Sequence, residues 1–397
     1  MKHIDEKPPL IKTSDHNSFA EFTIKTRKPM ILERVVDDNH FSDDVTKEIH
    51  NFLEEIRFGT IHALKNLSNN AIFWNEKVAE FEGKTWLELP WFFAETYFYR
   101  RLCEITGYYE SGSINYLLDP FKVQKINLME SDLLGMIESG LFKLHERNKL
   151  TMQTYLDTCL WGNRADLSNI TVNLAHSDEE LTGASHLTKL IDHSINIQEV
   201  LAEGVEKISY FVDNVGREFF SDLLFIDYLL RSKLVENIHL FVKPSPFFVS
   251  DVMRENVVDS INQLKQVGKE DCRQFADRIK GYIAHRQIII RDPEELSTFL
   301  MFKEMNSGFY DEISDSDMVI MKGDANYRRL MGDRKWKPSR RTEEILKYFP
   351  VPLVMIRTLK AEIMTGLSEE ECLDIVERDK DWMINGNYGL IQLIHKN

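Results

Sequence analysis

Asp213 and Asn214 place a carboxylate and a carboxamide at a point where a chain can bind a ligand. They follow directly on an apolar run at 208–212, and Gly216 and a helical pattern come next. Open α/β sheets bind ligands beyond the carboxyl ends of their strands, where a helix N-terminus favours phosphate. Oxygen ligands of this kind suit a hard cation. Because Asp and Asn are also common helix caps, the pair alone leaves capping and ligand binding open.

Polar side chains recur just after three later apolar runs that read as strands. They are Lys243, Ser250 and Asp251 after 238–242, Asp324 and Asn326 after 318–321, and Arg357 and Lys360 after 351–356. If the strands are parallel, their ends share one edge of the sheet and these side chains converge there. Each group also has an ordinary explanation. The alternatives are a cap of the following helix for Asp251, a solvated strand end for Lys243, a turn for Asp324 and Asn326, and a surface pair for Arg357 and Lys360.

The chemistry of such a cluster is constrained by its atoms. Asp213, Asn214 and Asp251 offer oxygen ligands with no Cys or His among them, which argues against zinc. Oxygen donors suit Mg²⁺ or Mn²⁺, with water and a substrate phosphate completing the coordination. The basic residues of the cluster would supply positive charge for a phosphoryl group. The pattern therefore predicts metal-assisted phosphate chemistry.

Two segments of the first half are more polar than the apolar helices beside them. Asn163 and Asp166 favour a loop that reaches over the cleft and binds substrate hydroxyls, although a C-cap at Gly162 followed by a turn explains them equally well. Glu95 and Arg100 lie in an aromatic-rich segment and are further candidates for substrate binding. From the residues alone, buried Glu–Arg pairing in the core is the better explanation for them.

The elements that would position these residues change character near residue 200. Helical spacing dominates before it, at 43–67, 86–106, 145–161 and 182–205. After it, apolar runs at 208–212, 238–242, 287–290, 318–321, 351–356 and 389–394 alternate with helical patterns at 217–230, 253–268, 294–305 and 340–348. This alternation predicts an α/β fold whose mostly parallel sheet is covered on both faces. We expect a mainly helical domain over 1–200 and an α/β domain with the site over 201–397.

The composition narrows the class of partner. The net charge of −15 argues against nucleic-acid binding, since phosphate backbones select basic surfaces. It allows small phosphate esters, because a local cation cluster can reverse the field in one cleft. The four scattered cysteines, the absence of an apolar leader and the lack of a run of about 20 apolar residues predict a cytoplasmic protein without membrane contact. We expect a monomer.

Several stretches match a known family pattern, and together they span nearly the whole chain. They are 212–218, Lys243-Pro244 with 248–252, 95–101, 160–168, 357–362, and the most specific one, Lys322-Gly323-Asp324-Ala325-Asn326-Tyr327-Arg328 continuing to Trp336. On these residues the sequence resembles the metal-dependent damage-control phosphatases, a family formerly known as a domain of unknown function. The resemblance is to the branch of acidic residue methyltransferase-like and sugar phosphate phosphatases.

The resemblance implies a Rossmann-like three-layer α/β domain behind a helical N-terminal domain. It implies a divalent metal (Mn, Co, Ni or Mg) on Asp213, Asn214 and Asp251, and hydrolysis of sugar phosphates such as fructose 1-phosphate or fructose 6-phosphate in metabolite repair. The phosphate would meet the basic residues, and the sugar would meet the polar ones. The binding set is Lys243, Arg357 and Lys360 for the phosphate, and Asn163, Asp166, Asp324, Asn326, Ser250, Glu95 and Arg100 around the rest of the substrate. Either a water or Asp213 would be the nucleophile.

Two other classes of function compete with hydrolysis. One is an S-adenosylmethionine-dependent methyltransferase that esterifies protein glutamate carboxyl groups. The sequence has no G-x-G-x-x-G loop after the strand at 208–212, which weakens this hypothesis. The other is a non-catalytic sensor of sugar phosphates, and the intact set of three metal-ligand candidates favours catalysis over it.

Overall fold

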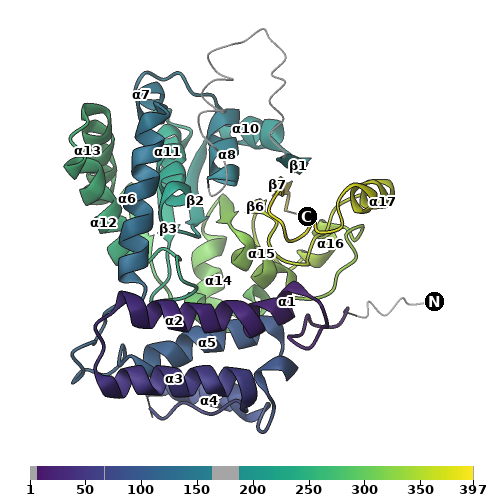
Figure 1. Ribbon diagram of the computed structural model, residues 1–397. Coiled ribbons are helices and arrows are strands. Elements are labelled where there is room, and N and C mark those ends of the chain that lie inside the picture. The colour runs from purple at the N-terminus through teal and green to yellow at the C-terminus, as the bar shows by residue number, and fades with distance from the viewer. Residues whose placement is uncertain (1–6, 67, 163–186, 397) are drawn as a thin grey trace.

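Seven strands form a single sheet in the order β1-β7-β6-β5-β2-β3-β4 (Figure 1). The computed structural model describes residues 7–66, 68–162 and 187–396. The strands are β1 Thr188–Asp192, β2 Val205–Phe211, β3 Val235–Phe241, β4 Ile288–Arg291, β5 Met318–Lys322, β6 Leu353–Thr358 and β7 Tyr388–Ile394. Neighbours pair in parallel except at β6 and β7, which are antiparallel. The predicted mostly parallel sheet is confirmed.

Helices cover both faces of the sheet because successive strand residues point to opposite sides. In β6, Val354 and Ile356 belong to one buried apolar cluster, whereas Leu353 and Met355 belong to another. The helices of the first cluster are α6 Lys122–Glu138, α7 Leu141–Glu146, α8 Met152–Trp161, α10 Ser194–Ala202, α11 Arg217–Arg231, α12 Arg254–Gln266 and α13 Glu270–Ala284. Those of the second are α14 Ser307–Ser314, α15 Asp324–Met331, α16 Thr342–Ile345 and α17 Glu369–Arg378. The predicted three-layer α/β architecture is therefore confirmed.

A helical part precedes the sheet and lies below it in Figure 1. It consists of α1 Phe19–Phe22, a π-helical turn Thr23–Arg27, α2 Lys28–Asp38, α3 Asp43–Phe58, α4 Asn69–Ala79, a 3₁₀ turn Trp86–Glu88 and α5 Trp91–Ile105. Its own core is rich in aromatic rings, such as Trp86 and Phe93, which both stack on Tyr97. The predicted helical N-terminal region is confirmed.

The change from helical part to α/β part comes earlier than residue 200. The core of the helical part ends at Phe121, and residues from Met129 onward pack in the first cluster of the sheet. Helices α6, α8 and α10 thus pack in the α/β layers although they precede residue 201, and the division into two domains stays a prediction. Local periodicity cannot assign a helix to a layer, since the partner that buries its apolar face is distant in sequence.

The helices expected over 43–67 and 145–161 are shorter in the structure, Asp43–Phe58 and Met152–Trp161, and three further segments differ more. The helix expected over 182–205 contains strand β1, an edge strand too short to show its period. The helix expected over 294–305 consists of two 3₁₀ turns, Glu294–Ser297 and Phe302–Glu304. The helix expected over 340–348 is reduced to α16, four residues long. No helix in the described residues is both long and apolar enough to span a membrane.

An extended segment near the N-terminus ties the two parts together. Ile11 donates its backbone N–H to Asp333 O at 2.9 Å, and its carbonyl accepts from Trp91 N at 2.9 Å. Bridges Leu10–Arg334 and Lys12–Pro90 continue the same pairing on either side. Residues 9–13 therefore form a strap between the first turn of α5 and the loop after α15.

Candidate functional site

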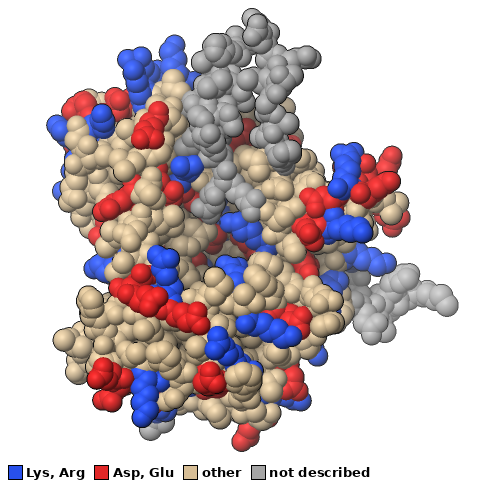
Figure 2. Space-filling model, viewed as in Figure 1, with Lys and Arg blue, Asp and Glu red and all other residues tan. Residues whose placement is uncertain are grey.

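A cleft of about 420 Å³ opens beyond the carboxyl ends of β2, β3, β5 and β6, where the helical part meets the sheet. Six of the predicted site residues line it together, and Glu95 joins them from α5. The six are Asp213, Asn214, Ser250, Asp251, Asp324 and Lys360. On the face drawn in Figure 2, Lys and Arg side chains gather beside the hollow between the two parts. The predicted convergence at one sheet edge is thus observed for these residues.

Backbone pairing brings the segments after β2 and β3 against each other. Asn214 and Asp251 form an antiparallel bridge, with Val215 N donating to Ser250 O at 2.8 Å and Val252 N to Asp213 O at 2.9 Å. The two loops are separated by 37 positions between Asn214 and Asp251 (251 − 214), but hydrogen bonding fixes them as one unit. The three metal-ligand candidates therefore share one rigid support.

The side chains of this unit face one another. Asn214 Nδ2 donates to Asp213 Oδ2 at 2.7 Å and to Glu218 Oε2 at 3.1 Å. Asn214 Oδ1 accepts from Ser250 Oγ at 2.6 Å. Asp251 is 1% exposed, and its Oδ2 has no hydrogen-bond partner within the described residues, although Lys243 Nζ lies 3.5 Å away. A buried carboxylate oxygen without a donor is costly unless something else binds it.

The electrostatics of the unit show a shortage of positive charge. Burial and the neighbouring carboxylates of Glu218 and Asp251 raise the pKa of Asp213 well above its ordinary value. Burial raises the pKa of Asp251 to about 6, against the opposing effect of Lys243. Burial also lowers the pKa of Lys243. A divalent cation among these oxygens would offset the excess negative charge. Carboxylate and carboxamide oxygens are the donors that Mg²⁺ and Mn²⁺ prefer.

Gly323 makes room for Asp213. It has φ +87° and ψ 167°, a region open essentially to glycine, and it immediately precedes α15. A Cβ at this position would lie 2.0 Å from Asp213 Oδ2 and 2.6 Å from Asp213 Cβ. The Lys-Gly-Asp motif therefore sets the position of a metal-ligand candidate on the neighbouring strand.

One of the three phosphate-binding candidates lines the cleft, and the other two lie behind it. Lys360 lines the cleft. Arg357 is 1% exposed and donates from Nε to Asp324 Oδ1 at 2.8 Å and from Nη1 to Ile363 O at 2.6 Å, and its Nη2 lies 2.7 Å from Asp324 Oδ1. Arg357 does not line the cleft, so its contact with substrate stays a prediction that this position does not favour. Its observed role is to hold Asp324, which does line the cleft.

Three other predicted site residues do not line the cleft. Lys243 is buried behind Asp251, and Asn326 donates to Val212 O and Lys322 O instead of lining the cleft. Arg100 donates to Asn70 and stacks on Tyr109, away from the cleft. Glu95 reaches the cleft, but buried ion pairs occupy both of its oxygens. Asn163 and Asp166 lie outside the described residues.

Glu218 is a cleft residue that the sequence argument did not assign. It lies in the first turn of α11, four positions after Asn214, and Asn214 Nδ2 donates to it. Behind it, Lys322 Nζ lies 3.4 Å from Glu218 Oε1 and 2.8 Å from Asp222 Oδ1. The spacing of four from Asn214 was the signal available in the sequence. Arg27, Lys28 and Arg328 also line the cleft and were not assigned.

A second acidic cluster lies apart from the cleft and is neutralised by protein. His145, Glu146 and Asp227 come close enough together to hold a cation. However, Arg278 donates to Glu146 Oε2 at 2.9 Å and to Asp227 Oδ2 at 2.8 Å, and His145 Nε2 lies 2.6 Å from Asp227 Oδ2. A guanidinium thus occupies the place that a metal ion would take, so this cluster is an ion-paired part of the core.

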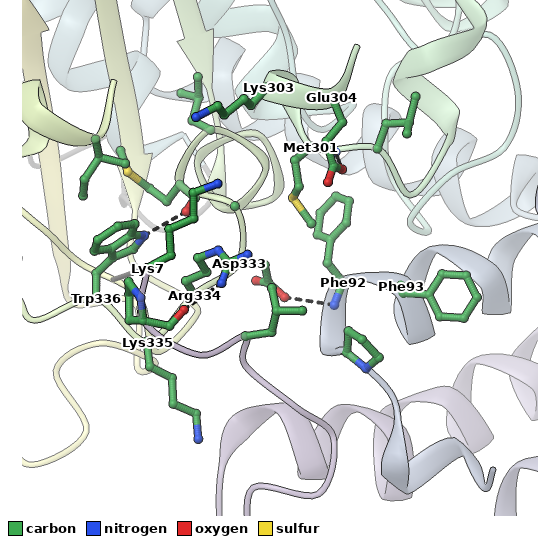
Figure 3. Close-up of a pocket in the computed structure, with 18 of the residues that line it drawn as sticks. Lys7, Phe92, Phe93, Met301, Lys303, Glu304, Asp333, Arg334, Lys335 and Trp336 are labelled. Carbon is green, nitrogen blue, oxygen red and sulfur yellow. Dashed lines mark hydrogen bonds between the residues drawn. The ribbon is translucent and has the colours of Figure 1, made fainter. Parts of the chain in front are cut away.

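A larger cavity, about 1160 Å³, lies at the far end of α15 (Figure 3). Phe92 and Met301 line one side of it, and Trp336 lies on the other. Its buried carboxylate, Asp333, accepts from Phe92 N at 2.9 Å and is paired with Arg328. Size alone favours this cavity, but the uncompensated carboxylates lie in the smaller cleft, which is therefore the candidate active site.

The chain is similar to known proteins over most of its length. Residues 23–375 match the family described as "Damage-control phosphatase ARMT1-like domain". A Damage-control phosphatase ARMT1 from Xenopus laevis is 30% identical, over 98% of this chain and 99% of its own length. The protein of the same name from Homo sapiens is 29% identical, over 97% and 98%. A solved structure of a DUF89 family protein from Pyrococcus horikoshii aligns over 95% of this chain and 98% of its own, with a TM-score of 0.48 and 14% identity.

Proposed function

Because the chain belongs to the damage-control phosphatase ARMT1-like family, we propose that its cleft hydrolyses phosphate monoesters of sugars with the help of a divalent metal. Esters of the fructose 1-phosphate or fructose 6-phosphate type are the proposed substrates. The observation that carries this proposal is the group of buried carboxylates, only partly compensated by Lys243 and Lys322, in the cleft that Lys360 also lines. The cleft volume of about 420 Å³ suits a small ligand of this kind.

Asp213, Asn214 and Asp251 are the residues that would hold the metal, with Mn²⁺, Co²⁺, Ni²⁺ and Mg²⁺ as candidates. A divalent cation here would polarise a phosphoryl oxygen of the substrate. Asn214 presents Nδ2 to the carboxylates, so metal binding would require its carboxamide to turn and offer Oδ1 instead. Ser250 can serve either orientation, because a hydroxyl both donates and accepts.

The remaining cleft residues would bind and orient the substrate. Lys360 would neutralise the phosphate. Asp324 would accept a hydrogen bond from a sugar hydroxyl, since Arg357 fixes its carboxylate from behind. Glu218 lies beside the metal-ligand candidates and is a proposed acceptor for a proton of an attacking water.

The nucleophile is a water or Asp213. Rapid-quench trapping of a phosphorylated Asp213 would establish the covalent route. If no phosphoaspartate accumulates while phosphate is released at the full rate, water is the nucleophile.

The activity is tested by phosphate release from a panel of sugar phosphates with each of the four metals. Asp213→Ala should lose activity, whereas Asp311→Ala, an exposed carboxylate on α14 outside the cleft, should retain it. The proposal fails if wild type and Asp213→Ala release phosphate equally, or if wild type is inert across the panel. The loop after β2 presents the Asp213 carboxylate to the cleft, an observation that favours hydrolysis over transfer of a methyl group from S-adenosylmethionine.

A further inference from the structure

A π-helical turn interrupts the first long helix where that helix reaches the cleft. The helix runs through α1, residues 23–27 and α2, and the backbone N–H of Lys28 bonds to Thr23 O, five residues back. Pro29 accounts for the irregularity, because it has no N–H to donate to Lys25 O and its ring crowds that carbonyl. Such turns are rare and occur frequently at functional sites. This one ends in Arg27 and is followed by Lys28, and both line the cleft.

The π-helical turn is fixed against the α/β part. Trp91 Nε1 donates to Thr23 Oγ1 at 2.8 Å, and the guanidinium of Arg328 lies 3.4 Å from the centroid of a Trp91 ring. Arg328 comes from α15, whose first residue, Asp324, lines the same cleft. The helical part therefore presents Arg27 and Lys28 beside Arg328 in a defined position.

The ion pairs of this end of the cleft leave donors free. Lys28 Nζ lies 3.1 Å from Glu95 Oε1 and donates to Tyr99 Oη at 3.3 Å, which accounts for two of its three hydrogens. Arg328 donates to Glu95 Oε2 at 2.5 Å and twice to Asp333, which uses three of its five N–H groups. Arg27 has a ring contact with Phe19 and no ion pair within the described residues. This end of the cleft thus offers donors.

The charges of the group around Glu95 sum to a positive excess. Arg27, Lys28 and Arg328 carry three positive charges, and Glu95 and Asp333 carry two negative charges, so 3 − 2 leaves one. The other charged residues that line the cleft are net negative, Lys360 against Asp213, Glu218, Asp251 and Asp324, so the positive excess is confined to the group around Glu95. An anionic group with several hydrogen-bond acceptors, such as a carboxylate or a phosphate, would fit beside these donors. The phosphate that reacts would lie against the α/β part, beside Lys360 and the metal-ligand candidates, whereas Arg27 and Lys28 come from the helical part.

We propose that Arg27 and Lys28 bind a second anionic group of the substrate, so that the favoured substrates are phosphate monoesters with a carboxylate or a second phosphate remote from the reacting phosphate. Glu95 positions the two cations that touch it and does not itself bind the substrate. This inference rests on the proposed phosphatase function and names its substrate class.

The test compares two acyclic esters that differ at one end, sorbitol 6-phosphate with a hydroxymethyl group and 6-phosphogluconate with a carboxylate. Charge-assisted hydrogen bonds predict a kcat/KM about 10- to 100-fold higher for 6-phosphogluconate. Fructose 1,6-bisphosphate against fructose 1-phosphate tests a remote phosphate in place of the carboxylate. Arg27→Gln should bring both ratios toward one. Lys25→Gln, on the same turn but outside the cleft, should leave them unchanged.

The inference is overturned if wild type shows no preference for the partner with the additional anionic group in either pair, or if Arg27→Gln keeps the preference. Calorimetric binding of the same esters separates this inference from the phosphatase function. Charge-dependent binding without phosphate release would refute hydrolysis and keep the second anion site. Phosphate release without any preference for the additional anionic group would support hydrolysis and refute the second anion site.

Discussion

Replacing Gly323 with alanine should test how the Lys-Gly-Asp motif supports the metal site. The new Cβ would lie 2.0 Å from Asp213 Oδ2 and 2.6 Å from Asp213 Cβ. Rotating the carboxylate relieves the first contact but not the second, so the backbone of one strand end must shift. Backbone strain at this φ and ψ costs about 1–3 kcal/mol, and the overpacking adds about 1–3 kcal/mol more.

Gly268→Ala is the matched control for this prediction. Gly268 also has positive φ, +74°, but no atom lies within 4 Å of the place that an alanine Cβ would take, so the change imposes strain without a collision. Urea denaturation of the metal-free proteins should show Gly323→Ala less stable than Gly268→Ala by about 1–3 kcal/mol. Calorimetric titration with Mn²⁺ should show an affinity about 10- to 100-fold weaker for Gly323→Ala, and near the wild-type value for Gly268→Ala. Equal stability of the two variants, together with unchanged Mn²⁺ affinity, would refute the reasoning.

Two further predictions concern charge. The pKa of Asp251 is about 6 in the folded protein and ordinarily 3.8, so protonation of this group should stabilise the metal-free protein as the pH falls from 6 toward 4, whereas Mn²⁺ affinity should fall about tenfold per pH unit for each competing proton. Thermal melts measure the stability and calorimetry the affinity over about pH 4.5–7.5. If stability and affinity change in the same direction with pH, the assignment of Asp251 as a metal ligand is contradicted. Arg278→Met should destabilise the protein by about 2–4 kcal/mol, because it leaves Asp227 and Glu146 without their guanidinium partner. Chelators should not change this loss of stability. If added metal instead stabilises the protein, the cluster of His145, Glu146 and Asp227 binds a cation.

The sheet edge and its central ligands were predictable because the signals are local. Each apolar run of β2, β3, β5 and β6 ends close to its expected residue, and the parallel arrangement brings the following polar residues together. The strand ends alone were therefore enough to predict that Asp213 and Asp251 lie close together.

The division of roles between neighbouring residues was not predictable. Arg357 and Lys360 stand three positions apart, but Arg357 still belongs to β6 and turns into the core, whereas Lys360 lies beyond the strand and reaches the cleft. Nothing in the sequence distinguishes the two cations. The contribution of Lys28 was hidden for another reason, since its position depends on how a remote helix packs on Trp91.

The strap at residues 9–13 has a consequence for the order in which the molecule is completed during synthesis. Ile11 pairs with Asp333, and Lys335 with Pro9, so the strap cannot close before residue 335 has been synthesised. From residue 11 that is 335 − 11 = 324 further residues, or roughly 15–65 s at about 5–20 residues per second. During that time residues 9–13 can pair with the segment at the start of α5, but their partners in the loop after α15 do not yet exist. The junction of the two parts, and with it the cationic end of the cleft, is therefore among the last pieces of the structure to form.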